Sequence, residues 1–338
     1  MSEISVRDVA VHAGVSVGTV SNALNHPDKV SPATLARIEA SIHTLGFVRN
    51  DAARQLRLGY SQAIGLIVLD GGNPFFTALS QGAEERASEA GLSVLVGNSA
   101  QQADRQQQYL DLFEQQRVRG VLLSPVDSND AAVARLRQRG IPTILVDAES
   151  GDAALPSVSV DDVAGGRLAM EHLLSIGRRR IGVLAGPVSL QQVHDRLEGA
   201  RQAIASHPAA QLEVIECAGL TVLDGRAAGS AILERAPEDR PDAILAANDL
   251  LAVGAMQALV VTGRLRVPDD VAIIGYDDID FAAATVVPLS SIRQPASALG
   301  RTAIELLLEA ERGESPRSVR FTPELIVRES TIGSKTSR

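Results

Sequence analysis

Short apolar segments alternate with amphipathic segments from residue 63 onward, and this alternation restricts the folds open to the chain. The apolar runs of the first round are AIGLIVLD, LSVLVGN, GVLLSP and PTILVD. After Val160 a second round contains RIGVLAG, LEVIEC, AILAAND and VAIIGYDD. Helical periodicity is found near 75–90, 101–118, 129–139, 162–176, 193–206, 224–235 and 249–262. Strands that alternate with helices form parallel doubly wound sheets, so we expect two α/β subdomains with a cleft between them.

Polar residues follow several of these apolar runs. In open α/β sheets, ligands bind beyond the carboxyl ends of the strands. In this chain those ends carry Asp70, Ser124, Asp147, Asn248 and Asp277. The sequence therefore predicts a small-molecule site in the cleft.

The beginning of the chain has a different pattern, VRDVAVHAGVSVGTVSNALN over Val6–Asn25. Ala10 is small enough for two helices to cross closely, Gly14 permits the positive φ of a turn, and Val20 returns an apolar side chain to the junction. Ser16 is a good N-cap for the second helix. The spacing predicts a helix-turn-helix, whose second helix enters the DNA major groove, and a plain αα-hairpin is the alternative.

A third helix and a linker follow. Ser31 and Pro32 read as an N-cap and a first helical position, and apolar residues then repeat at helical spacing up to Gly46. A three-helix head of about 45 residues is within the range that folds alone. The next segment, NDAARQLRLG, is long enough for about two helical turns, so we expect a linker that folds on contact.

The net charge of −9 at pH 7 is unusual for a nucleic-acid-binding protein, but it is unevenly distributed. Residues 1–60 contain six basic and five acidic side chains, a net charge of +1, so the remainder carries −10. Such a head would bind random DNA weakly, because non-specific affinity comes mainly from neutralised phosphates. Site-specific binding by a dimer is compatible with this distribution.

Other functional classes find little support. No GxGxxG opens a helix after a strand, no GxxxxGK[ST] occurs, and no serine and histidine form a recognisable nucleophile elbow. Cys217 is the only cysteine, and the six histidines lack metal-ligand spacing. We therefore expect no enzyme, no cofactor and no metal site. The chain shows no signal-peptide pattern and no apolar run approaching 18 residues, so we expect a cytoplasmic protein with no membrane partner.

The chain resembles the lactose/galactose repressor (LacI-type) family of bacterial transcriptional regulators over nearly its whole length. The resemblance rests on ordered segments, among them VRDVAVHAGVSVGTVSNALN, AARQL, NPFF, GVLLSP, IPTILVD, DRLEGA, AANDLLAVGAM, VAIIGYDDI, LSSIRQP and LIVRES. It implies an all-α helix-turn-helix head joined by a hinge helix to an α/β core like that of the periplasmic binding proteins. It also implies a dimer that binds a pseudo-palindromic operator and changes its DNA affinity when a small molecule binds in the cleft.

The resemblance implies a division of the chain. The head is residues 1–49, the hinge helix or linker is 50–61, and the effector-binding and dimerisation core is 62–338. Within the core, the expected N-subdomain is about 62–160 plus 292–320, and the C-subdomain is about 161–291 plus 321–338. FTPELIVRES reads as one C-terminal strand, and the absence of leucine heptads after it favours a dimer over a zipper-linked tetramer.

Family positions on the recognition helix place Val17, Gly18 and Asn22 where base edges are read. Val17 suits a thymine methyl, Gly18 admits close approach, and Asn22 suits adenine, a contact worth roughly 1–3 kcal/mol. A solvated helix face is the alternative for Asn22. Implied phosphate contacts are Ser16, Thr19, Ser21 and Asn25, with Asn50 as a phosphate contact or N-cap.

In the linker, Leu56 matches the leucine that the family inserts into the minor groove at the operator centre. Ala53 lies one turn earlier and gives each hinge helix a narrow apolar face. Unstacking the central step costs a few kcal/mol, which contacts to the bent DNA must offset. The alternative for Leu56 is an exposed apolar side chain with no specific role.

In the cleft, the resemblance implies effector contacts that suit hydrogen bonding to vicinal hydroxyls, the chemistry of a sugar or sugar derivative. The implied residues are Phe75, Phe76, Asp147, Asp161, Arg196, Leu220, Asn248, Asp277 and Gln294. Asp161 either joins the site or caps a helix, and one of the two phenylalanines is expected to face the core. Leu220 stands where several relatives have an aromatic residue, which weakens any prediction of a purine. Asp278 is expected to cap the following turn.

Two other functions share parts of this pattern. A sugar-binding protein without a regulatory role would have the same core without a DNA-binding head, and a sugar-processing enzyme would turn over its ligand. Inducer and corepressor would use the same residues, so the direction of regulation is not readable from the sequence.

Overall fold

The computed structural model describes residues 4–47, 61–126 and 130–333. By its internal contacts the chain divides into two units, Met1–Ser61 and Gln62–Arg338. The first is a small helical head and the second is a larger α/β core.

The head contains α1 (Val6–Ala13), α2 (Val17–Asn25), a 3₁₀-helix (Pro27–Lys29) and α3 (Pro32–Leu45). Gly14 ends α1 at a φ of 62°, and Ser16 then caps α2 by accepting a hydrogen bond from the Thr19 amide. Ser31 caps α3 in the same way. The buried core of the head is Val9, Ala10, Ala13, Val20, Ala23, Ile38 and Phe47. The predicted helix-turn-helix and third helix are confirmed.

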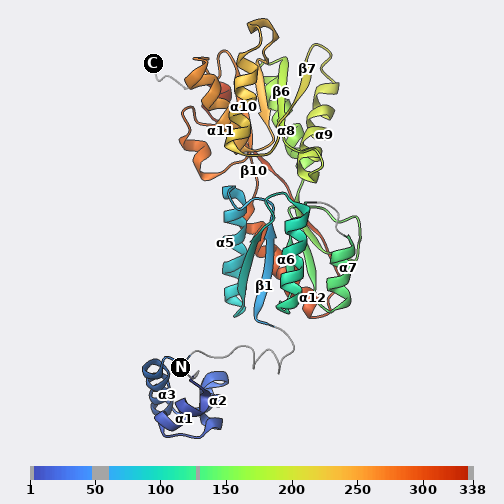
Figure 1. Ribbon diagram of the computed structural model, residues 1–338. Coiled ribbons are helices and arrows are strands. Elements are labelled where there is room, and N and C mark those ends of the chain that lie inside the picture. The colour runs from blue at the N-terminus through green and yellow to red at the C-terminus, as the bar shows by residue number, and fades with distance from the viewer. Residues whose placement is uncertain (1–3, 48–60, 127–129, 334–338) are drawn as a thin grey trace. The chain divides into compact units, whose positions relative to one another are not determined.

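The first sheet of the core has the strand order β11-β5-β4-β3-β1-β2, and all its strands are parallel. Its strands are β1 (Ala63–Val68), β2 (Ser93–Asn98), β3 (Val121–Leu123), β4 (Thr143–Val146), β5 (Ser157–Val160) and β11 (Val319–Phe321). Its helices are α5 (Pro74–Glu89), α6 (Ala103–Gln115), α7 (Asp130–Gln138) and α12 (Ala296–Glu311). Helices α5 and α12 cover one face, and α6 and α7 cover the other (Figure 1). We call this layered body the first lobe.

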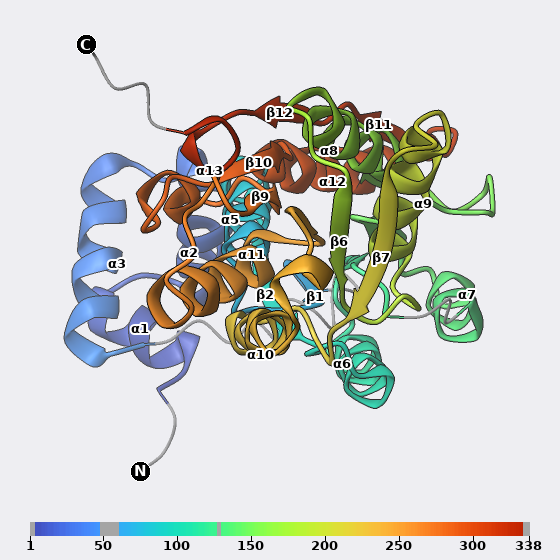
Figure 2. The same ribbon diagram turned by 90° about the horizontal axis from the view of Figure 1, so that it is seen from above.

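The second sheet has the order β12-β10-β9-β8-β6-β7, and only β12 runs antiparallel to its neighbour. Its strands are β6 (Arg180–Ala185), β7 (Gln211–Glu216), β8 (Ala243–Ala246), β9 (Ala272–Asp277), β10 (Ser290–Arg293) and β12 (Glu324–Ile326). Its helices are α8 (Asp162–Ser175), α9 (Gln191–Ala205), α10 (Val222–Leu233), α11 (Asp249–Met256), a π-helix (Gln257–Thr262), α13 (Glu329–Ile332) and the 3₁₀ turns Pro237–Asp239 and Asp280–Ala284. Helices α8 and α9 lie on one face, and α10 and α11 on the other (Figure 2). This body is the second lobe.

The inner strands of both sheets are buried on both faces, which explains why they read as continuous apolar runs, whereas the edge strands β2 and β7 are partly exposed. The prediction of two doubly wound, mainly parallel sheets is confirmed. FTPELIVRES differs from its prediction, because it is not one strand. Its first residue ends β11 in the first sheet, its middle forms β12 in the second, and its last two residues begin α13.

Within the described residues, the chain passes between the lobes three times. The first crossing, at Asp161, leads from β5 to α8, and the second, at 294–295, leads from β10 to α12. The third, at 322–323, leads from β11 to β12. Arg320 lies 3.0 Å from Asp161 and so joins the first and third crossings by an ion pair.

Helices within each lobe pack so closely that glycine is required at the contacts. A Cβ at Gly300 of α12 would lie 2.0 Å from the Leu79 carbonyl oxygen of α5. A Cβ at Gly166 of α8 would lie 1.9 Å from the Arg196 carbonyl oxygen of α9. Gly166 thereby lets α9 pack closely against α8 at Arg196.

Candidate functional site

A pocket lies between the two lobes, at the carboxyl ends of strands from both sheets. Its polar lining is Asp70, Asn73, Gln101 and Asp147 from the first lobe, and Gln192, Arg196, Asn248 and Asp277 from the second. Its apolar lining is Leu69, Phe75, Phe76, Leu190, Val193 and Leu220. The free cavity has a volume of about 30 Å³, room for about two water molecules. A larger ligand therefore requires the lobes or the lining side chains to move apart.

Arg196, on α9, is held on several sides. Its Nε donates to Asp162 Oδ1 at 2.7 Å, and its Nη1 donates to the Ala247 carbonyl oxygen at 2.7 Å. The guanidinium carbon lies 3.7 Å from the centre of the Tyr276 ring. The side chains of Arg196 and Asp162 are both 8% exposed. Burial opposes the Arg196 charge, but Asp162 and the other nearby acids raise the pKa of the guanidinium overall, so it stays a cation.

Asp277 ends β9 and connects the lobes. Its Oδ2 accepts from Asn73 Nδ2 of the first lobe at 3.0 Å, and its Oδ1 accepts from Gln294 Nε2 at 2.8 Å. Arg196 Nη1 lies 3.8 Å from the same Oδ1. Burial raises the pKa of Asp277, and the Arg196 charge opposes that rise.

Asp147 follows β4 and faces the second lobe across the pocket. Gln192 Nε2 donates to its carbonyl oxygen and to its Oδ2, both at 2.9 Å. Its Oδ1 is buried and has no hydrogen-bond partner among the described residues. Burial, and secondly the charge of Asp162, raise the pKa of Asp147 to about 8. One oxygen of a carboxyl group that lines the pocket is therefore left without a partner among the described residues.

The remaining pocket residues form its walls. Asn248 caps α11 by accepting from the Leu251 amide, and its Nδ2 donates to the Leu220 carbonyl oxygen at 3.0 Å. Phe75 and Phe76 both line the pocket, with ring centroids 5.0 Å apart in an edge-to-face arrangement. Both residues also pack in the hydrophobic core, and the division into one cleft-facing and one core-facing ring stays a prediction.

Three predicted residues lie beside the pocket rather than in its lining. Asp161 caps α8 by accepting from the Ala164 amide at 2.9 Å, the second of its two expected roles. Gln294 contacts the pocket through Asp277. Asp278 does not cap the next turn, since the 3₁₀ turn that follows has no side-chain cap, and its carboxylate meets Arg293 and Arg328 instead.

The sequence analysis did not single out several residues that contribute to the site. These are Asn73, Gln101, Asp162 and Gln192. Asn73 has a local signal, because it precedes Pro74 and is the N-cap of α5. Asp162 and Gln192 have none, because their partners come from distant segments.

On the head, one face of α2 is exposed. Val17, Gly18, Ser21 and Asn22 lie on it, while Val20 and Ala23 are buried. Positions three and four apart on a helix share a face, which groups Val17 with Ser21, and Gly18 with Ser21 and Asn22. Ser16 Oγ also lies 2.8 Å from Thr19 Oγ1, and Thr19 is half-buried. Asn50, Ala53, Leu56 and the Asn25 side chain lie outside the described residues.

Within the part of the chain that the structure describes, no group of three or more histidine, cysteine, aspartate and glutamate side chains is arranged to hold a metal ion. None of the described helices is long and apolar enough to span a membrane.

A helix-turn-helix head followed by a two-lobed α/β core with a polar pocket between its lobes defines a ligand-regulated DNA-binding protein. Residues 5–50 match the model of the bacterial regulatory proteins of the lacI family, and residues 61–329 match that of the periplasmic binding proteins and sugar binding domain of the LacI family. The chain belongs to the LacI family of bacterial regulatory proteins.

Similar proteins agree with this assignment. The HTH-type transcriptional regulator CelR of Thermobifida fusca is 35% identical over 334 residues, which cover 95% of this chain and 96% of CelR. A solved CelR–cellobiose complex has a TM-score of 0.72 at 30% identity, over 97% of this chain and all of that one. The Lac repressor dimer bound to operator and an anti-inducer has a TM-score of 0.83 at 28% identity, over 98% and 99% of the two chains. These relatives are transcriptional regulators rather than enzymes, as predicted.

Proposed function

We propose that this protein is a cytoplasmic transcriptional repressor that binds a pseudo-palindromic operator as a homodimer and is switched by a carbohydrate bound between its lobes. One observation carries the proposal: a single chain combines an exposed recognition-helix face with an interlobe pocket built around Arg196. In this proposal residues 1–49 bind DNA, 50–61 form the hinge, and 62–338 bind the effector and dimerise. The core divides into an N- and a C-subdomain close to the predicted bounds, except that residues 292–293 lie in β10 of the second sheet and Phe321 ends β11 of the first.

The exposed face of α2 supports base reading by Val17, Gly18 and Asn22, and phosphate contacts by Ser16, Thr19 and Ser21. Asn22 carries the richest hydrogen-bonding side chain of the three base readers, so operator discrimination depends on it most. Leu56 is the proposed minor-groove wedge, and its role remains a prediction from the sequence. The dimer on operator seen for the Lac repressor supports a dimeric binding mode here.

A carbohydrate effector is supported by the chemistry of the pocket. Asp70, Asp147 and Asp277 offer carboxylate oxygens, while Asn248 and Arg196 add an amide and a guanidinium. Carboxylates and guanidinium groups make strong, directional hydrogen bonds, which suits a ligand with many hydroxyl groups. The cellobiose bound by CelR supports the same class of ligand.

The regulatory step follows from the small free volume of the pocket. A sugar enters only when the lobes separate or the lining rearranges, and it then bridges residues of both lobes. A ligand shifts a conformational equilibrium only by its differential affinity for the two states, so coupling of about 1–3 kcal/mol is the reasonable expectation. That shift alters the angle between lobes and thereby the hinge segments that precede them.

Operator binding is tested by footprinting the full-length protein on the DNA upstream of its own operon. Protection of a palindrome supports the proposal. Asn22→Ala should weaken operator binding by roughly 1–3 kcal/mol. Glu39→Gln, an exposed change on α3, is the matched control and should leave binding unchanged. Leu56→Ala should also weaken protection. Absence of any protected site would overturn the regulatory proposal in favour of a sugar-binding protein.

Effector binding is tested by calorimetry over a sugar panel that includes cellobiose. One sugar should bind to the wild type and fail to bind to Arg196→Ala. Arg201→Ala is the matched control, because Arg201 is an exposed arginine on the same helix. Affinity retained by Arg196→Ala contradicts the assignment of this pocket, and turnover of the sugar would instead support an enzyme.

A further inference from the structure

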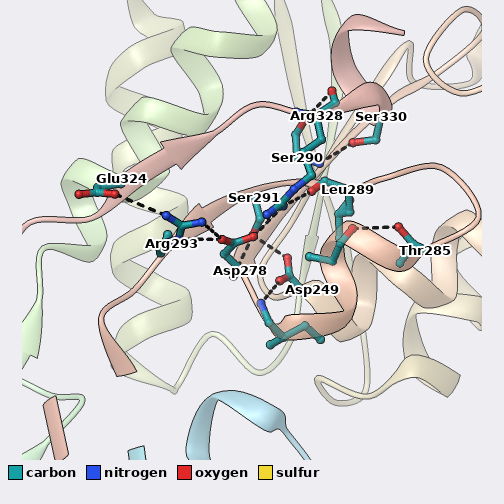
Figure 3. A network of polar contacts seen from close by, with 12 residues as sticks. Asp249, Asp278, Thr285, Leu289, Ser290, Ser291, Arg293, Glu324, Arg328 and Ser330 are labelled. Atoms are coloured by element: carbon teal, nitrogen blue, oxygen red, sulfur yellow. Dashed lines mark hydrogen bonds and ion pairs between the residues drawn. The ribbon is translucent and has the colours of Figure 1, made fainter. Parts of the chain in front are cut away.

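Two residues of the pocket are each followed directly by a buried aspartate that lies outside the pocket lining. Asp249 follows Asn248 and is fully buried. Asp278 follows Asp277, and its side chain is 4% exposed. Figure 3 shows both carboxylates within one network that reaches β10 and the C-terminal segment. The proposed effector function gives roles to Asn248 and Asp277 but none to Asp249 or Asp278.

Asp249 holds the turn that carries Asp277. Its Oδ2 accepts from the Ile279 amide at 2.8 Å, and its Oδ1 accepts from Ser291 Oγ at 2.6 Å. Ser291 Oγ in turn accepts from the Asp278 amide at 3.1 Å (Figure 3). The turn needs this support, because Asp277 and Asp278 have φ values of 106° and 54°, which L-residues rarely adopt. Such conformations persist only where the surroundings over-determine them.

Asp278 connects this turn to two of the three crossings between the lobes. Arg293 Nε and Nη2 both lie 2.8 Å from its Oδ2, and Arg328 Nη1 lies 2.6 Å from its Oδ1. Arg293 is the last residue of β10 and immediately precedes the second crossing. Arg328 follows β12, the strand that receives the third crossing. The buried carboxylate of Asp278 therefore links two arginines near these crossings to the turn that carries Asp277.

We infer that Asp278 is a positioning residue that couples the effector contact at Asp277 to the second and third interlobe crossings through Arg293 and Arg328. The inference rests on the proposed function for the meaning of the effector contact. A ligand that moves Asp277 must also move the adjacent carboxylate, and both arginines follow it. Arg293 Nε donates a directional, charge-assisted hydrogen bond to Asp278, so motion of this carboxylate is passed to Arg293 and the second crossing. The contact with Arg328 is an ion pair, and Arg328 Nη1 also donates to the Leu289 carbonyl oxygen. Packed elements of this kind switch between discrete arrangements.

The test uses the full-length protein as wild type, Asp278→Asn, Arg293→Gln and Asp280→Asn. Asp280 is an exposed acid two residues away and serves as the matched control. Operator affinity is measured with and without the sugar, cellobiose being the first probe. Asp278→Asn should keep its sugar-free operator affinity within about twofold, and its sugar-induced change should fall at least about fivefold. Arg293→Gln should also reduce the sugar-induced change. A further protein that carries both Asp278→Asn and Arg293→Gln should reduce it little more than either single substitution.

Hydrogen exchange without sugar gives a second readout. Asp278→Asn should exchange faster than wild type at the amides in and beside the two crossings, those of Gln294, Ala296, Thr322 and Glu324, whereas Asp280→Asn should not. The inference would be overturned if Asp278→Asn and Arg293→Gln both kept the wild-type sugar-induced change in operator affinity and also exchanged amide hydrogens at the wild-type rate. A wild type that responds to no sugar would overturn the proposed function instead, while the exchange measurement would still test the link from Asp278 to the crossings.

Discussion

The Arg196 guanidinium stacks on the Tyr276 ring at 3.7 Å, which fixes the plane in which its remaining donors face the pocket. Asp162 and the Ala247 carbonyl oxygen occupy two of its donors in that plane. A planar fork of donors can satisfy these partners and still meet a ligand, which a single ammonium cannot. The stacked arginine therefore defines the geometry of the whole site.

Arg196→Lys should separate ligand binding from stability. The lysine keeps a charge beside Asp162 but loses the fork, so sugar affinity should fall at least about tenfold, or about 1.4 kcal/mol. Arg196→Ala leaves Asp162 buried without its cation, which should cost about 3–5 kcal/mol of unfolding free energy. Calorimetry and urea denaturation check the two effects, and equal destabilisation by both substitutions would contradict the prediction.

Asp147 should make core stability depend on pH. Its pKa of about 8 in the folded state lies above that of an unfolded aspartate, so the folded protein binds the extra proton between these values. Stability should therefore fall as pH rises from about 4 to about 8, by at most about 1.4 kcal/mol per pH unit for this group. Asp147→Asn removes this contribution. Urea denaturation from pH 5 to 8 should show a flatter profile in the variant, and parallel profiles would argue against a protonated Asp147.

Gly300→Ala should disrupt the contact between α12 and α5. The new methyl carbon would lie 2.0 Å from the Leu79 carbonyl oxygen, and neither backbone can yield without moving a helix. Overpacking of this kind costs about 1–3 kcal/mol or more. Gly151→Ala is the control, because a Cβ there has no neighbour within 4 Å. Thermal unfolding should show a lower midpoint for Gly300→Ala alone.

Gly18→Ala should stabilise α2 and weaken operator binding at the same time. A Cβ at Gly18 would lie 3.6 Å from Ser16 Oγ, an ordinary contact. Replacing glycine by alanine in a helix gains up to about 1 kcal/mol. The same methyl group would stand between the helix and the proposed groove floor. Slower hydrogen exchange in α2 together with weaker footprinting is the expected outcome, and unchanged operator affinity would mean that Gly18 does not approach the DNA.

Much of the architecture was predictable because its causes are local. The inner strands of both sheets are buried on both faces, so each of those that were predicted appears in the sequence as a short apolar run. The turn at Gly14 and the caps at Ser16 and Ser31 are decided by single residue types. The strand-end residues Asp147, Asn248 and Asp277 were likewise predictable, because topology brings the carboxyl ends of parallel strands together.

The rest depends on how distant segments meet. Asp161 and Asp162 are adjacent, yet only the first caps α8 and only the second pairs with Arg196. Asp277 accepts from Asn73 and Asp147 accepts from Gln192, each across the two lobes, which no local pattern encodes. FTPELIVRES reads as one strand in the sequence, whereas its pairing partners belong to two sheets.

The late crossings of the chain bear on its synthesis. The first lobe lacks α12 and β11 until residue 321 has been made, long after β5 ends at Val160. By then the second lobe lacks only β12 and α13 among its described elements. A ribosome that stops near residue 290 would therefore release neither lobe in finished form, with the apolar α5 face uncovered. Truncated chains should be removed by proteolysis rather than persist as DNA-binding fragments with a half-built sensor.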